Sequence, residues 1–268
     1  MNKKLINVSD IVSYLYCPRK LYLTKIKRIP SPQTPEMIKG RLKHEILEDF
    51  SRKEKEFVSS IDRDYEKLDL VFMYENLLTA IAQEVLDWNK NLLNSFRINS
   101  EEILKKTIKD FTEDIKIRVE AIKEKLKENL FGEELWKNLD KIYLSEIPLE
   151  SENLGLKGRV DRIMISKKDN TITPFELKSR EGQIYQSDEL QLTAYAMLLE
   201  ERYKTKIEKG IVEASSLKKE IIITKENREL VLEILDEIKA LKEDFPPMML
   251  SNFNKCKSCS LNEICPNI

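Results

Sequence analysis

Four cysteines most constrain how this chain can fold. Three lie close together near its end, at Cys256, Cys259 and Cys265, in the spacing C-x₂-C-x₅-C, whereas Cys17 lies near its beginning. The C-x₂-C spacing is typical of metal sites, and four thiolates suit either a tetrahedral zinc ion or a [4Fe–4S] cluster. Spacing leaves both metals open, and ordinary buried or redox cysteines, or a disulfide, are the alternative. Either metal would tie the two ends of the chain together.

A metal clasp of this kind would stabilise the fold. Closing the loop from Cys17 to Cys256 removes roughly 5 kcal/mol of unfolded-chain entropy, by the relation used for disulfides. We therefore expect the cysteine site to be structural. Pro18 and Pro266 each follow a cysteine directly, as in some iron–sulfur motifs.

The charge balance limits how the chain could bind nucleic acid. Charged residues make up 35% of the sequence, yet the net charge is only −1. Any contact with DNA must then come from a local groove and not from a basic surface as a whole. No stretch approaches the ~20 apolar residues needed to cross a bilayer, and the first residues lack the apolar run of a signal peptide. We expect a cytoplasmic protein without a membrane segment.

Hydrophobic periodicity predicts a chain of alternating helical and strand regions. Helices are expected over 8–29, with a break at Pro18, and over 36–53, 77–96, 104–130, 187–202 and 226–242. Strands are expected over 142–149, 156–166, 172–179, 207–215 and 220–223, with a turn at 153–155. Trp88 and Trp136 are expected in helix packing, with base stacking as the alternative.

These elements suggest four parts. Residues 1–53 hold the N-terminal helices with the first cysteine and the only histidine, His44. Residues 54–140 form a helical insert, residues 141–245 a core of strands and helices, and residues 246–268 the segment with three cysteines. The insert is expected to be a helical subdomain, with a wall over an active site as the alternative.

An acid on one predicted strand and an acid–lysine pair on the next mark a candidate catalytic site. Asp161 ends the run Gly158-Arg159-Val160-Asp161, and Glu176-Leu177-Lys178 follows on the neighbouring strand. Side chains alternate along a strand, so Glu176 and Lys178 face the same side. Carboxylates are ligands for Mg²⁺ or Mn²⁺, and a lysine can place a water or offset phosphate charge. A solvated hairpin face is the alternative.

Several motifs in one order resemble a known family. They are Cys17-Pro18-Arg19-Lys20-Leu21-Tyr22, His44-Glu45, Gly158-Arg159-Val160-Asp161, Glu176-Leu177-Lys178, Gln191-x-x-x-Tyr195 and the last three cysteines. The set resembles the CRISPR-associated RecB-like nucleases of the PD-(D/E)XK superfamily, which carry an iron–sulfur cluster. The resemblance implies an α/β nuclease core, with a mixed central sheet flanked by helices. It also implies a C-terminal iron–sulfur clasp. The resemblance covers residues 8–50 and 142–266, and the long helical insert between them departs from the compact members of the family.

The resemblance also implies a role for each matching residue. His44, Asp161, Glu176 and the backbone carbonyl of Leu177 would hold Mg²⁺ or Mn²⁺. Asp161, Glu176, Lys178, Gln191 and Tyr195 would form the catalytic set. Cys17, Cys256, Cys259 and Cys265 would hold a [4Fe–4S] cluster, which the family favours over zinc. Arg19 and Lys20 could contact phosphate, although surface charge is an equal interpretation.

The implied function is a metal-dependent exonuclease that acts on single-stranded DNA or DNA ends without reading base sequence. The family's context is CRISPR adaptation, with CRISPR integrase proteins as partners. Two alternatives stay open: a RecB-like repair nuclease working with a helicase, and a non-catalytic subunit that binds DNA and helps assemble the integration complex.

Overall fold

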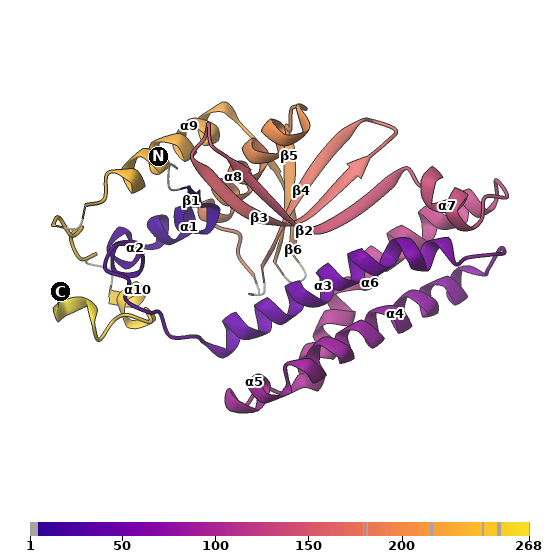
Figure 1. Ribbon diagram of the computed structural model, residues 1–268, viewed down its shortest axis with the longest axis horizontal. Helices are drawn as coiled ribbons and strands as arrows, with labels where there is room; N and C mark the ends of the chain where they lie inside the picture. Colours follow the sequence, from indigo (N-terminus) through magenta and orange to yellow (C-terminus); the bar gives the residue numbers. More distant parts are fainter. Residues whose placement is uncertain are drawn as a thin grey trace.

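A mixed six-stranded sheet forms the centre of the described part of the chain (Figure 1). The structure is a computed structural model that describes residues 5–178, 180, 182–214, 217–242, 244–250 and 253–267. The strands are β1 (Ile6–Asn7), β2 (Lys141–Ser151), β3 (Leu156–Ser166), β4 (Thr171–Lys178), β5 (Lys209–Ala214) and β6 (Leu217–Ile222).

Strand order places β3 and β4 in the middle of the sheet. β2, β3 and β4 pair antiparallel in succession, β4 pairs parallel with β5, and β6 closes the far edge antiparallel to β5. The parallel pair needs a crossover, and helix α8 (Gln186–Tyr203) supplies it. The short strand β1, which the sequence pattern did not predict, pairs parallel with the start of β3. The predicted α/β core with a mixed sheet is confirmed.

Helices surround this sheet. They are α1 (Val8–Tyr16), α2 (Pro18–Lys25), α3 (Pro35–Ser59), α4 (Lys67–Trp88), α5 (Lys90–Ser95), α6 (Ser100–Leu126), α7 (Gly132–Asn138), α8, α9 (Lys225–Lys239) and α10 (Phe253–Lys257), with a 3₁₀ turn at Cys265–Asn267. The predicted break in the first helix falls at Cys17, whose extended backbone caps α2 with Pro18 at its first position.

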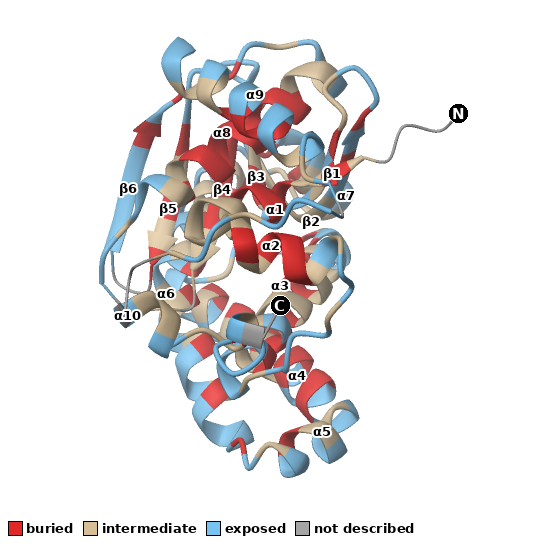
Figure 2. Ribbon diagram, turned by 90° about the vertical axis from the view of Figure 1, so that its left-hand side faces the viewer, coloured by how far each residue is buried: buried red, intermediate tan, exposed pale blue. Residues whose placement is uncertain are grey.

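Two large apolar cores hold these layers together, and a small third cluster lies beside the cysteines of the C-terminal segment. One joins α3, α4, α6 and α7, and the other joins the sheet to α1, α8 and α9. Helix α8 is buried along most of its length (Figure 2). Arg162 on β3 links the two parts, because its guanidinium pairs with Asp114 of α6 and with Glu213 of β5. The helical layer is therefore fixed against the sheet by charge pairing as well as by packing.

The helical part differs from its sequence-based outline in three ways. The boundary expected after residue 53 falls inside α3, because Ile38 through Phe50 already contribute to the helical core. The helix expected over 77–96 begins earlier and is divided at Asn89 into α4 and α5. Trp88 is 86% exposed, so its expected core packing is wrong, whereas Trp136 packs against the helical core. Among the described residues, no helix is long and apolar enough to span a membrane.

Candidate active site

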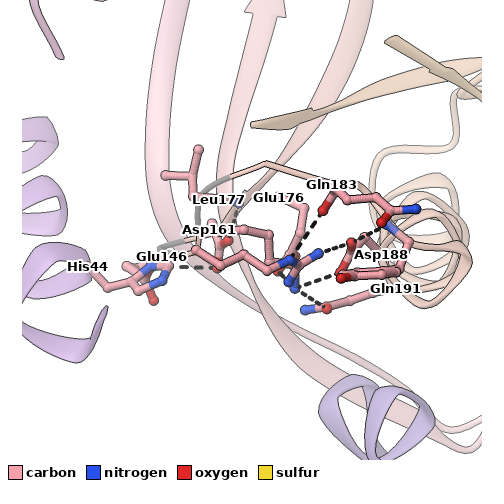
Figure 3. A network of polar contacts seen from close by, with 11 residues as sticks. His44, Glu146, Asp161, Glu176, Leu177, Gln183, Asp188 and Gln191 are labelled. Carbon is pink, nitrogen blue, oxygen red and sulfur yellow. Dashed lines mark hydrogen bonds and ion pairs between the residues drawn. The ribbon is translucent and has the colours of Figure 1, made fainter. Parts of the chain in front are cut away.

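Three acidic residues lie in a row across the central strands (Figure 3). In the β2–β3 ladder, Glu146 occupies the position opposite Asp161, between pairs that are formed on either side. In the β3–β4 ladder, Asp161 lies opposite Glu176, one position beyond the pair of Arg162 and Phe175. Directly opposite residues of adjacent strands bring their side chains together. The sheet therefore gathers carboxylates from three different strands at one place.

Glu146 reaches this place through an unusual backbone conformation. Its φ is +54°, in the left-handed region that non-glycine residues seldom adopt, and it interrupts an otherwise continuous ladder. Such conformations cost of order 1–3 kcal/mol and concentrate at functional sites. Motif reasoning missed Glu146. Folding the sequence about the predicted turn at 153–155 would have aligned it with Asp161.

His44 approaches the acids from helix α3. Its Nδ1 lies 2.7 Å from Oε1 of Glu146 and 3.6 Å from Oδ1 of Asp161. These three residues each offer one donor atom, and the three atoms lie within 4.8 Å of one another. One imidazole and two carboxylates at this spacing can share a divalent cation. The structure thus brings together two predicted metal ligands, His44 and Asp161, and adds a third.

The crowded charges alter how these groups bind protons. Burial by itself lowers the pKa of His44, but its hydrogen bond to Glu146 and the charges of Asp161 and Glu146 outweigh this and raise it to about 9. Burial, followed by the charge of Asp161, raises the pKa of Glu176 to about 8 despite Lys178. Burial also raises the pKa of Asp161, against the opposing influence of His44. Without a cation, the site holds extra protons at neutral pH.

Lys178 lies on the other side of Glu176 from this group. Its Nζ donates to Oε1 of Glu176 at 2.7 Å and to Oε1 of Gln191 at 2.7 Å, and lies 3.5 Å from Asp188. Burial alone would lower the pKa of Lys178, but Glu176 outweighs it and the pKa is raised. Lys178 is therefore an ammonium ion at neutral pH. The second carboxylate oxygen of Glu176 is buried and has no hydrogen-bond partner.

Leu177, which lies between Glu176 and Lys178, is held by both its backbone and its side chain. The backbone N–H of Leu177 donates to Oδ2 of Asp161 at 2.6 Å, while the Leu177 side chain packs against the helical core. This hydrogen bond fixes the orientation of the Asp161 carboxylate. Ligation by the Leu177 carbonyl stays a prediction.

Tyr195 closes the site from helix α8. It is 5% exposed, and burial followed by the charges of Glu176 and Asp161 raises its pKa. A Cβ added at Gly158 would lie only 2.8 Å from Cε1 of Tyr195 and 2.9 Å from Cγ2 of Val8. Glycine is thus required at the start of the Gly158-Arg159-Val160-Asp161 run, because helices α1 and α8 approach the strand closely there.

An open groove of ≈ 1160 Å³ adjoins the site. It lies between the end of the β2–β3 hairpin and the helices α1 and α8, and Gly158, Arg159 and Tyr195 form part of its wall. Arg159 also reaches the acids, with Nη1 3.9 Å from Oε2 of Glu146. Lys157, Arg202 and Lys204 line the groove further out, with Glu150, Glu152 and Glu201 among them. The groove therefore borders the acidic cluster through Arg159 and Tyr195, while the acids themselves do not line it.

The four cysteines meet at the opposite end of α1. All four line one cavity of ≈ 120 Å³, between helix α2 and the C-terminal segment, which lie side by side in Figure 1. None forms a disulfide. Tyr16 donates to the carbonyl of Lys255 at 2.8 Å, and Ser31 and Ser260 bond at 2.9 Å, so the two ends of the chain are joined around the cavity.

Arg19 and Lys20 lie beside this cavity and not in the groove. Arg19 is buried, at 8% exposed, and its guanidinium donates to the carbonyl oxygens of Pro247 and Cys265. Nζ of Lys20 lies 5.1 Å from the ring centre of Tyr16. As placed, Arg19 serves the contact between α2 and the C-terminal segment, and a role in phosphate binding stays a prediction for both.

Comparisons with known proteins find similarity to a curated protein and to a solved structure. A curated relative, the CRISPR-associated exonuclease Cas4/endonuclease Cas1 fusion of Leptospira interrogans serogroup Icterohaemorrhagiae serovar Lai (strain 56601), is 35% identical over 125 residues. That match covers 43% of this chain and only 23% of the relative. A solved structure, titled the crystal structure of SSO0001, is 19% identical and aligns with 83% of this chain and 96% of its own, with a TM-score of 0.34, which does not establish a shared arrangement.

The family comparison covers nearly the whole chain. The sequence model of the PD-(D/E)XK nuclease superfamily matches residues 6–266, a span that includes the acidic cluster, Lys178, α8 and all four cysteines. The chain belongs to the PD-(D/E)XK nuclease superfamily.

Proposed function

We propose that this protein is a metal-dependent DNA exonuclease that acts on single strands or DNA ends and prepares DNA for CRISPR spacer acquisition. The observation that carries the proposal is the grouping of His44, Glu146 and Asp161 within 4.8 Å, beside the Glu176–Lys178 pair. Membership of a nuclease superfamily supports the chemistry, and the relative's description as a CRISPR-associated exonuclease supports the context.

The donor set fits a divalent cation. His44, Glu146 and Asp161 would hold it, with Glu176 and the Leu177 carbonyl available to complete its shell; an imidazole among carboxylates favours Mn²⁺ over Mg²⁺. When bound, such an ion lowers the pKa of a water and polarises the scissile phosphate. Glu146 accepts a hydrogen bond from Nδ1 of His44, and Asp161 lies close to the same atom. The two carboxylates therefore orient the imidazole ring. Proton loss from His44 and Glu176 frees the donors for the cation.

Lys178 stabilises negative charge in this proposal and does not act as a base. Its raised pKa keeps it charged, and Glu176 and Gln191 hold its Nζ in place. A fixed ammonium near the reacting phosphate offsets charge that develops in the transition state. Gln191 positions the lysine, and Tyr195 excludes water from the side of α8 while bordering the groove.

The groove supports a polynucleotide substrate. Its wall includes Arg159, a half-exposed cation that lies 3.9 Å from Glu146 and whose guanidinium can contact the phosphate next to the scissile one. A backbone contact of this kind reads no base sequence, so we expect cutting without sequence preference. The relative combines an exonuclease and an endonuclease in one chain, and this supports a CRISPR integrase as a partner.

The cysteine cavity supports a [4Fe–4S] cluster over zinc. Four thiolates around one zinc, at about 2.3 Å each, would lie roughly 3.8 Å apart. Among the described residues, no three cysteine sulfurs lie within 4.8 Å of one another, and the four surround a cavity of ≈ 120 Å³. A four-iron cluster inserts its own atoms between the thiolates. Anaerobically purified protein should absorb broadly near 400 nm, roughly where iron–sulfur charge transfer falls; a colourless protein with one zinc would overturn this assignment.

Activity on labelled single strands tests the catalytic proposal. Lys178→Ala should slow the release of nucleotides with Mn²⁺ by about 10²–10³-fold, because a fixed charge next to the transition state is lost. Asp161→Ala should be at least as severe. Lys209→Ala is the matched control, since Lys209 lies on the adjacent strand and pairs with Glu220 at the surface. Comparing 5′-labelled with 3′-labelled strands gives the polarity.

The controls decide between the alternatives. Unchanged degradation in both variants would mean that the assigned site is wrong. Wild-type protein that binds single strands through the groove but releases no nucleotides would favour a non-catalytic assembly subunit instead.

A further inference from the structure

The side chain of Arg19 is buried in an unusual way. It is 8% exposed, Nη1 donates to the carbonyl of Pro247 at 2.8 Å, and Nη2 donates to the carbonyl of Cys265 at 3.3 Å. The third nitrogen, Nε, is buried and has no hydrogen-bond partner. Backbone contacts thus hold the guanidinium in place and leave its Nε–H buried and unused.

The charge of Arg19 also lacks a carboxylate partner. No aspartate or glutamate among the described residues forms an ion pair with it, and its two acceptors are neutral carbonyl oxygens. A guanidinium keeps its proton in proteins, so burial does not neutralise it. Burying a cation without a counter-charge is unfavourable. An anion close to Arg19 would offset this cost.

The cysteine cavity provides one. Arg19 lines the same ≈ 120 Å³ cavity as Cys17, Cys256, Cys259 and Cys265, and it accompanies Cys265 through the hydrogen bond to that residue's carbonyl. Cysteines that bind metal do so as thiolates. Four thiolates outweigh the two positive charges of an oxidised [4Fe–4S] core, so a cluster bound by these cysteines would be an anion in the cavity that Arg19 lines.

We propose that the Nε–H of Arg19 donates a hydrogen bond to a sulfur of the iron–sulfur cluster, and that its charge sets the cluster's reduction potential. The proposal rests on the cluster assignment above. Reduction adds one electron to the cluster and increases its negative charge. A hydrogen-bond donor and a fixed cation stabilise the reduced state more than the oxidised one, and so raise the potential. In this proposal Arg19 orients the cluster and tunes its reduction potential. DNA binding is assigned to the groove and not to Arg19.

A redox titration tests this role without relying on nuclease activity. Purified wild-type protein is first assayed for iron and sulfide, then reduced stepwise with dithionite while absorbance near 400 nm, about where the cluster absorbs, is followed. At the wild-type midpoint, Arg19→Met should shift the ratio of oxidised to reduced cluster by about tenfold toward oxidised. That corresponds to about 59 mV lower potential for one electron. Arg19→Gln, which keeps a donor but no charge, should fall between.

Lys20→Met is the matched control. Lys20 adjoins Arg19 and lines the same cavity, but its Nζ lies over the ring of Tyr16, and its removal should leave the potential unchanged. If Arg19→Met loses its cluster, the Arg19→Gln and Arg19→Lys proteins decide the question by the same titration. A wild-type potential in iron-loaded Arg19 variants would overturn the proposal, whether or not DNA binding weakens. If the purified wild-type protein contains no iron, the assignment of an iron–sulfur cluster to the cysteine cavity is itself wrong.

Discussion

The acidic site and the cysteine site both join residues that lie far apart in the sequence, yet they are assembled differently. In the acidic site, donors from α3, β2 and β3 already lie within 4.8 Å, and hydrogen bonds to His44, Leu177 and Lys178 hold them. In the cysteine site, the thiols surround a cavity, and the hydrogen bonds lie around its edge. The donors of the first site are therefore held together by protein contacts alone, whereas we expect the second to be stabilised further by the cluster proposed there.

Loss of the cysteine site should have the largest effect on stability. Cys256→Ser should lower the melting temperature by about 10 °C, since a clasp over this loop is worth up to roughly 5 kcal/mol and a chain of this size loses about 2 °C per kcal/mol. Removal of divalent cations from the wild type with a chelator should change it by less than about 2 °C. Calorimetry of both samples measures the difference.

The control for this comparison lies within the cysteine segment. Lys257→Ala changes an exposed side chain directly after Cys256 and should leave the melting temperature nearly unchanged. An equal loss of stability on chelation and on Cys256→Ser would remove the distinction between the two sites.

Glu146→Gln tests whether the acid that motif reasoning missed holds the cation. The change keeps size but removes a ligand carboxylate next to His44, and should weaken Mn²⁺ binding by more than the about 10–100-fold typical of losing an outer-shell partner. Isothermal titration with Mn²⁺ measures it. Glu150→Gln, on the same strand and exposed, is the control and should bind Mn²⁺ as the wild type does. Unaltered affinity in the Glu146 variant would restrict the site to the residues that motifs identify.

Proton competition should make Mn²⁺ binding depend on pH. Below pH 8 both Glu176, with a pKa of about 8, and His44, with a pKa of about 9, hold protons that a cation must displace. Affinity should therefore rise between pH 7 and 9, by about tenfold per pH unit for each proton released, and level off above pH 9. Titrations at fixed ionic strength follow this. Glu176→Gln should reduce the slope below pH 8, and a flat wild-type profile would contradict the charge arrangement.

Much of the fold follows from local sequence patterns, and the site follows only in part. Strand alternation and the predicted turns placed β2, β3 and β4 within a few residues, because the strands' apolar positions are regular. The motif residues Asp161, Glu176, Lys178 and Gln191 do lie together, and His44 adjoins them. Their assigned roles stay predictions.

The features that sequence patterns did not predict depend on contacts between residues that lie far apart in the sequence. Glu146 carries no motif, and its left-handed backbone is stabilised by the surrounding strands and not by its own type. The extent of α3 was underestimated because its core contacts come from α4 and α6, which lie later in the chain. From the sequence, Arg19 is expected to be a surface cation, because none of the residues next to it in the sequence indicates that the C-terminal segment covers it.

The alignment of Glu146, Asp161 and Glu176 across three strands restricts which insertions evolution can accept. Adding one residue to the hairpin turns at 152–155 or 167–170 preserves the site only if the ladders keep their register, because a slip of one position turns an acid to the opposite face. The helical region between α3 and β2 has no such parity requirement, since helix packing and the Asp114–Arg162 ion pair fix it, and not strand register. Length variation should therefore accumulate in 60–140 and be excluded from the strands, which a scan of single-residue insertions can measure.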